Sequence, residues 1–178
     1  MVKFFIEPEY DVKMPQREFG NGGIDVYVPS YTERFIEDFK NKNLSTCAEI
    51  VQDEKTGEYS ICVYPHKDVN IPTGLRSRIS ANIALEAHNK SGIASKKKLI
   101  FGASTVDASY QGIIHAHLIN TSSNTVVIPL GTKIIQFIPR YIDISPIEVY
   151  KGISVEEFYK DFEFSNRGEG AFGSTGLK

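Results

Sequence analysis

The chain has only two cysteines, Cys47 and Cys62, among its 178 residues. Two cysteines cannot form the multi-bridge framework that holds small secreted proteins together, and their spacing fits none of the common zinc-ligand patterns. The sequence therefore excludes a disulfide scaffold and favours a reducing, cytoplasmic location.

Long apolar runs and an excess of one charge are also missing. No apolar stretch approaches the roughly 20 residues needed to span a bilayer, and acidic residues interrupt the first ten residues too early for a signal peptide. The formal net charge is −2. We therefore expect neither a membrane protein nor a protein that binds nucleic acid directly.

What the sequence does have is an ordinary globular composition, with 41% hydrophobic and 24% charged residues. At this length we expect a sizeable core. Short, often alternating apolar segments dominate the chain and predict a mainly β fold. The strand-like segments lie at residues 2–6, 24–28, 48–52, 59–64, 79–88, 113–120, 125–129 and 133–139.

Two stretches carry helical signals. The first begins at Thr32, which can cap a helix, and continues to Lys42 with an apolar stripe on one side. The second, from Ser154 to Tyr159, is long enough for one or two turns. The three lysines at 96–98 are expected in a solvated loop.

The most informative stretch is Val106–Gly112, V-D-A-S-Y-Q-G, where one apolar run ends and a Tyr-Gln-Gly turn begins the next. This pattern predicts a β-hairpin. A carboxylate, Asp107, and an aromatic ring, Tyr110, near one bend can form half of a small-molecule site. Asp and Gly also suit turns for conformational reasons alone, so this stretch does not fix a function by itself.

The tail at residues 165–178 is rich in glycine and contains G-x-G-x-x-G at Gly168, Gly170 and Gly173. The dinucleotide-binding fingerprint needs a strand before it and a helix after it, and only five residues remain for a helix. We therefore reject that interpretation. A flexible glycine-rich arm can still wrap phosphates with its backbone amides.

Five segments in one order resemble the motifs of the trimeric dUTP pyrophosphatase (dUTPase) family. G-N-G-G-I-D-V-Y is similar to A-G-x-D-L, and N-K-S-G-I-A is similar to P-R-S-G-L-A. V-D-A-S-Y-Q-G resembles I-D-x-D-Y-x-G, and G-T-K-I-I-Q-F-I resembles G-x-R-I-A-Q-L-I. The fifth, R-G-E-G-A-F-G-S-T-G, is nearly identical to the family's C-terminal arm. Each motif is weak alone, but five in order are a specific signal.

The resemblance implies that dUTP is hydrolysed to dUMP and pyrophosphate by water attack on the α-phosphate. This reaction limits uracil in DNA and supplies dUMP for dTTP synthesis. Asp107 would orient and deprotonate the water, and Tyr110 would pack under the deoxyribose and refuse ribonucleotides. Asp25 would support the Asp107 region structurally, and Mg²⁺ would be held through the substrate phosphates without direct protein ligands.

The substrate-binding residues follow from the same resemblance. Uracil would be read by backbone groups between Gly102 and Ile114, phosphates would be held by side chains and amides, and Phe172 would stack on the base. The implied residues are Lys90, Ser91, Gly92, Gly102, Val106, Tyr110, Ile114, Gln136, Arg167, Phe172, Gly173, Ser174 and Thr175.

The resemblance also implies a distorted jelly-roll-like β-barrel and a homotrimer whose active sites are shared between subunits. The main domain would be 1–164, with a helix-plus-hairpin insertion at about 31–65, and the arm at 165–178 would close over the active site. The role of the insertion is open, and it is a candidate surface for a protein partner.

Three positions depart from the family motifs: Lys90 replaces an Arg, Ser109 replaces an acid and Ala171 replaces a Gly. The nearest alternative is a dCTP deaminase of the same fold, but His117 stands where that family has a catalytic Glu. Another is a regulatory module that binds a protein through residues 32–64. His115 and His117 lack a third ligand nearby, so surface or interface positions are expected for them rather than a metal site.

Overall fold

The computed structural model of the protein describes residues 1–160. The chain divides into two compact units, Met1–Ile144 and a second unit that begins at Ser145. The domain boundary expected at residue 164 lies inside the second unit and stays a prediction.

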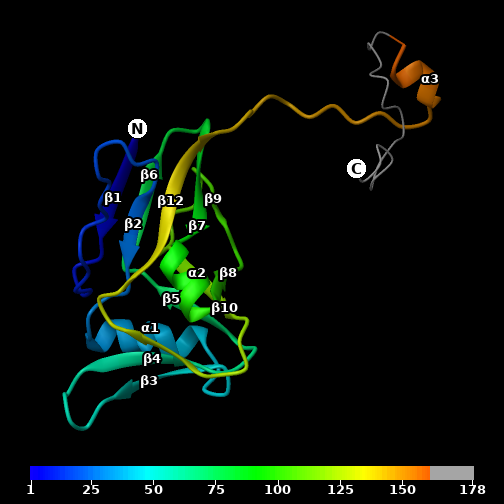
Figure 1. Ribbon diagram of the computed structural model, residues 1–178. Helices are drawn as coiled ribbons and strands as arrows, with labels where there is room; N and C mark the ends of the chain where they lie inside the picture. The colour runs from blue at the N-terminus through cyan, green and yellow to red at the C-terminus, as the bar shows by residue number, and fades with distance from the viewer. Residues whose placement is uncertain (161–178) are drawn as a thin grey trace. The chain divides into compact units, whose positions relative to one another are not determined.

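The fold is mainly β, as predicted (Figure 1). Within residues 1–160, none of the helices is long and apolar enough to cross a membrane. The strands are β1 (Val2–Ile6), β2 (Ile24–Tyr27), β3 (Ala48–Gln52), β4 (Tyr59–Val63), β5 (Asp68–Pro72), β6 (Leu75–Ile79), β7 (Ile83–Asn89), β8 (Leu99–Phe101), β9 (Thr105–Val106), β10 (His115–Asn120), β11 (Val126–Pro129) and β12 (Lys133–Tyr141). The helices are α1 (Glu33–Lys42), α2 (Ser91–Lys97) and, in the second unit, α3 (Val155–Phe158).

The strands of the first unit form four antiparallel sheets around one apolar core. Their orders are β1-β6, β5-β10-β8, β11-β4-β3 and β2-β12-β7-β9. β12 is central to the largest sheet because it pairs with β2 on one side and with β7 on the other. On β10, Ala116, Leu118 and Asn120 are buried, whereas the alternating residues His115, His117 and Ile119 are half-buried. One face of β10 is therefore free to carry polar side chains.

The prediction of a simple hairpin around the Tyr-Gln-Gly turn is wrong. β9 pairs with β7, whereas β10 pairs with β5 and β8, so the two flanking segments belong to different sheets. Leu118 of β10 lies opposite Phe101 of β8, and Val106 lies opposite Leu85 of β7. These apolar cross-strand pairs compete with the local hairpin, and the result is a wide loop between β8 and β10.

Helix α2 was not predicted, and the expectation of a loop at 96–98 is wrong. Ile93 is the only buried residue of α2, so the sequence has no apolar stripe with helical spacing. The helix ends at Lys98, which adopts a left-handed conformation with φ of 57° and donates its backbone N–H to Ile93. A left-handed residue of this kind commonly ends a helix.

The predicted helix and hairpin at 31–65 are present, and both belong to the main core. The hydroxyl of Thr32 accepts a hydrogen bond from the Phe35 amide at 3.1 Å, as expected of a cap. Phe35 and Phe39 are fully buried, and the helix ends at Asn43, whose side chain bonds both backbone groups of Asn70 in β5. The segment is therefore anchored to the strand that neighbours β10.

Candidate functional site

Asp107 lies beside a hollow of about 190 Å³ at the loop between β9 and β10. The carboxylate is exposed. The hollow has both polar and apolar walls, as small-molecule sites do. Its lining residues are Thr105, Val106, Asp107, Tyr110, Ile114 and His115.

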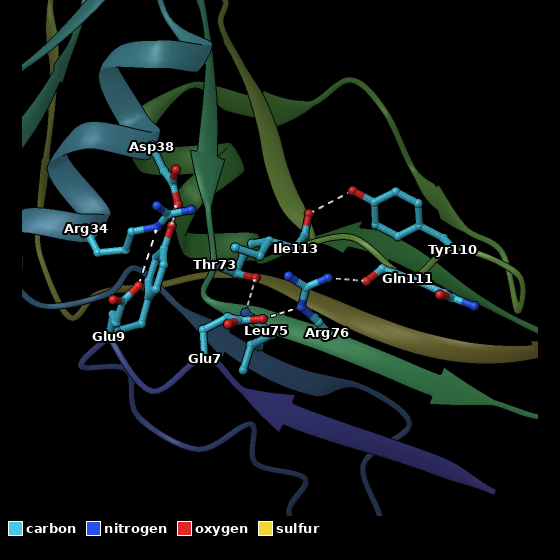
Figure 2. A network of polar contacts seen from close by, with 11 residues as sticks. Glu7, Glu9, Arg34, Asp38, Thr73, Leu75, Arg76, Tyr110, Gln111 and Ile113 are labelled. Carbon is cyan, nitrogen blue, oxygen red and sulfur yellow. Dashed lines mark hydrogen bonds and ion pairs between the residues drawn. The ribbon is translucent and has the colours of Figure 1, made fainter.

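The Tyr110 ring is held in place by its own turn. Its hydroxyl donates to the carbonyl of Ile113 at 2.9 Å, and its amide donates to the carbonyl of Asp107 at 3.1 Å. Figure 2 shows the Arg76 guanidinium between Glu7 and the carbonyl of Gln111. A Cβ on Gly112 would lie 2.5 Å from the Tyr110 hydroxyl, so only glycine lets the ring sit there.

Buried Thr73 fixes the other side of this loop. Its amide and its hydroxyl both donate to the carbonyl of Ile114, at 3.0 and 2.8 Å, and the Ile114 amide donates to the carbonyl of Leu75 at 2.8 Å. The Thr73 hydroxyl also accepts from the Leu75 amide at 3.3 Å (Figure 2). The bonds to Ile114 engage both its N–H and its C=O. Ile114 therefore lines the hollow with its buried side chain rather than with free backbone groups. Thr73 was not among the predicted site residues, because its bond to a backbone carbonyl 41 positions away leaves no local signal.

His115 also lines the hollow, although a surface or interface position was expected. Burial lowers the pKa of its imidazole, and the charge of Lys42 lowers it further, against a hydrogen bond with Ile113 and the charge of Asp38. The ring is therefore neutral at pH 7. No sequence signal separated His115 from a surface histidine.

A second, larger hollow of about 530 Å³ surrounds Asp25 of β2. Lys90 contacts Oδ1 of Asp25, and Lys133 lies 2.9 Å from Oδ2, so each carboxylate oxygen has its own ammonium group. Burial alone would raise the pKa of Asp25, but the hydrogen bonds and charges of Lys90 and Lys133 outweigh it and lower that pKa. The lining residues are Glu18, Asn21, Gly22, Gly23, Asp25, Lys90, Lys133, Gln136 and Ile138.

Gln136 stands at the centre of this group on β12. It lies opposite Asp25 on β2 and opposite His88 on β7, and its amide nitrogen donates to the carbonyl of Asn89 at 3.3 Å. A Cβ on Gly23 would lie 2.3 Å from Oε1 of Gln136, so the glycine lets the loop approach the amide closely.

Ser91 and Gly92 follow Lys90 directly and form the exposed first turn of α2. The first amides of a helix have no acceptor within the helix. The structure thus brings the predicted residues Lys90, Ser91, Gly92 and Gln136 to one region. Lys133 was missed, although it occupies the basic position of the motif that contains Gln136.

The two hollows share no lining residue. Both ion-pair partners of Asp25, Lys90 and Lys133, line the second hollow. The Asp25 carboxylate therefore supports Lys90 rather than Asp107.

Gly102 follows β8 and lies against His117. Arg167, Phe172, Gly173, Ser174 and Thr175 lie outside the described residues, as does the rest of the predicted arm. Within residues 1–160, no three His, Cys, Asp or Glu side chains form a group that could hold a metal ion.

Solved structures of dUTPases share this fold. The dUTPase of Staphylococcus bacteriophage 80alpha with dUPNHPP has a TM-score of 0.70 at 16% identity and covers 99% of both chains. The EIAV dUTPase has a TM-score of 0.58 at 15% identity, covering 87% of this chain and 100% of its own. At such identities the likeness is one of fold.

Sequence comparisons are more specific. A deoxyuridine 5'-triphosphate nucleotidohydrolase from Picosynechococcus sp. is 32% identical over 118 residues, which are 65% of this chain and 77% of the relative. One from Oryza sativa subsp. japonica is 34% identical over 107 residues, which are 60% and 57% of the two chains. The family model dUTPase matches residues 56–176, well over half of the chain. The chain therefore belongs to the dUTPase family, as its five motifs predicted.

Proposed function

We propose that this protein hydrolyses dUTP to dUMP and pyrophosphate. One observation carries the proposal: the described residues of the family motifs gather at two hollows of complementary chemistry. One hollow offers a carboxylate beside an aromatic ring, and the other offers ammonium and amide groups. A nucleoside triphosphate needs both, since its sugar and base require an apolar support and its phosphates require cations.

Asp107 is proposed as the general base that orients and deprotonates the attacking water. Its carboxylate is exposed, so water reaches it. A positioned base of this kind typically contributes about 10²–10⁴-fold to the rate. Tyr110 is proposed to support the deoxyribose, and its hydroxyl bond to Ile113 keeps the ring from turning away when the sugar binds. A fixed ring discriminates against a 2′-hydroxyl better than a mobile one.

The phosphates are proposed to contact Lys90, Ser91, Gly92 and Gln136. Mg²⁺ would bind the phosphate oxygens and water, which are its preferred ligands, and would neutralise phosphate charge. The donor set fits this mode, because Asp25, one of the two carboxylates that line the hollow, already pairs with two lysines. A structure of a phage phi11 dUTPase variant is described as revealing the coordination of a structural Mg(II) ion in that protein.

The complete site is proposed to form between copies of the chain in a homotrimer. Within one chain the two hollows share no residue, so a shared site explains how both reach one nucleotide. Exposed apolar side chains after β12, namely Ile144, Ile147 and Val149, also support self-association.

The C-terminal arm is proposed to close over the bound nucleotide through Arg167, Phe172, Gly173, Ser174 and Thr175. The proposed location of the reaction is the cytoplasm.

The test is an assay of the purified protein with dUTP, dTTP, dCTP and UTP in the presence of Mg²⁺, with monophosphate, pyrophosphate and ammonia resolved. We expect dUMP and pyrophosphate from dUTP, and a loss of kcat of about 10²-fold or more in Asp107→Asn. Ammonia from dCTP would instead indicate the deaminase of the same fold. Normal turnover in Asp107→Asn would remove Asp107 from the role of base.

A further inference from the structure

His117 of β10 makes three contacts that the proposed reaction does not explain. Its Nδ1 accepts a hydrogen bond from the backbone amide of Ala103 at 3.1 Å. Its Nε2 lies 3.0 Å from Oδ2 of Asp68 on the neighbouring strand β5. Its backbone carbonyl accepts from the amide of Gly102 at 2.9 Å. One residue therefore holds two successive amides of the loop that leaves β8.

These contacts fix the tautomer of the ring. A backbone amide can only donate, so Nδ1 must be the unprotonated nitrogen, and Nε2 carries the hydrogen that it donates to Asp68. Asp68 thus keeps the ring in the form that can accept from Ala103. The carboxylate also restrains ring rotation, in the way that second partners orient functional histidines.

Gly102 is fitted to the same ring. A Cβ at this position would lie 2.3 Å from Nδ1 of His117, a distance that real Cβ atoms do not show. Any larger residue at 102 would displace the imidazole or the loop. The His117 ring thus packs directly against the Cα of Gly102. This close packing explains why position 102 is a glycine, although its backbone does not adopt a positive φ.

The loop held by His117 leads directly to the Asp107 hollow. On its far side the Ser104 carbonyl accepts from the Ala87 amide of β7 at 2.6 Å, and Thr105 and Val106 then form β9 and line the hollow. The loop is thus fixed at two points, by β7 and by the His117 ring. A small cavity of about 50 Å³ lies between the loop and β10, so the loop has room to move if the ring is removed.

We propose that His117 is a positioning residue for base recognition, which holds the loop 102–104 and thereby sets the position of β9, whose residues Thr105 and Val106 line the Asp107 hollow. This inference rests on the proposed function and on the expectation, from the family motifs, that the base is read by backbone groups between Gly102 and Ile114. His117 touches neither the nucleotide nor the reacting atoms in this role. It acts through Ala103, and Asp68 acts through His117.

The test compares His117→Leu with His117→Asn in the full-length protein. Asn can place its amide oxygen near the position of Nδ1 and so keeps a hydrogen-bond acceptor for the Ala103 amide. Leu fills similar space but has no hydrogen-bond acceptor. Hydrogen exchange of the Ala103 amide, measured by NMR without nucleotide, reports the contact directly. We expect exchange about threefold to tenfold faster in His117→Leu, the range for one lost hydrogen bond, and near-normal exchange in His117→Asn.

Kinetics then test the link to the base. His117→Leu should raise KM for dUTP by about threefold to tenfold with kcat changed less than about twofold, and should lower the preference for dUTP over dCTP. His117→Asn should restore most of both. Unchanged exchange in His117→Leu would overturn the proposal, and so would faster exchange with an unchanged KM and preference. If the wild-type protein hydrolysed no dUTP, the proposed function would fail, and the exchange experiment would still decide whether His117 holds the loop.

Discussion

Replacement of Phe35 by alanine tests whether the segment at 31–65 is part of the core or an appendage. Phe35 has no exposed surface, packs edge-on against Tyr10 with ring centroids 6.2 Å apart, and contacts Phe39 at 6.1 Å. Removing a buried phenylalanine ring costs about 3–5 kcal/mol through lost transfer energy and the cavity left behind. The two aromatic contacts place the expected loss of unfolding free energy in the upper half of that range.

The assay is thermal unfolding at fixed protein concentration, since the melting temperature of a self-associating protein depends on its concentration. For a chain of this size about 1 kcal/mol corresponds to roughly 2–4 °C, so Phe35→Ala should melt at least about 8 °C below the wild type. Leu44→Ala is the matched control, because Leu44 is largely exposed at the end of the same helix and should change stability by less than about 0.5 kcal/mol. A Phe35→Ala variant that melts within about 2 °C of the wild type would refute core membership.

Three further predictions concern the site. Tyr110→Ala should admit UTP, because the fixed ring is the group proposed to exclude the 2′-hydroxyl; unchanged selectivity for dUTP over UTP in steady-state kinetics would remove Tyr110 from that role. Coexpression of Asp107→Asn with Gln136→Ala should give mixed oligomers with more activity than either variant alone, and mixed oligomers that stay inactive would contradict a shared site. The lowered pKa of His115 means that the unfolded chain binds more protons below its ordinary pKa of 6.5. Stability should therefore decline as the pH falls from about 6.5, and His115→Gln should flatten that part of the melting-temperature profile between pH 7.5 and 5.

The sequence predicted most strands and the capped helix α1, because alternation and capping are local signals. It failed where contacts between distant segments decide. Val106 pairs with Leu85 rather than across its own turn, and α2 has one buried residue, Ile93, too few for a periodic pattern. The segment at 31–65 also proved to be part of the core. A protein partner of this segment must therefore contact its exposed side chains, and a deletion of residues 32–64 would remove core residues such as Phe35.

The same division applies to the site. Family motifs located Asp107, Tyr110, Lys90 and Gln136, since each stands at a fixed offset within a short pattern. Residues that act on these from other elements were missed. Thr73 reaches the Ile114 carbonyl across 41 positions of sequence, and Lys133 reaches Asp25 from another strand. The contacts of such long-range partners leave no local pattern, even where the residue itself, like Lys133, stands in a motif.

The two lysines that share Asp25 have a consequence for ligand exchange. One carboxylate, Asp25, faces two ammonium groups in a hollow that the Glu18 carboxylate also lines, so acidic and basic groups balance in number there. If Lys90 leaves Oδ1 for a phosphate oxygen, as proposed, Lys133 still neutralises Oδ2, and no half-buried anion is left alone. An incoming polyphosphate therefore exchanges one ionic partner for another, and its affinity should weaken steeply with added salt.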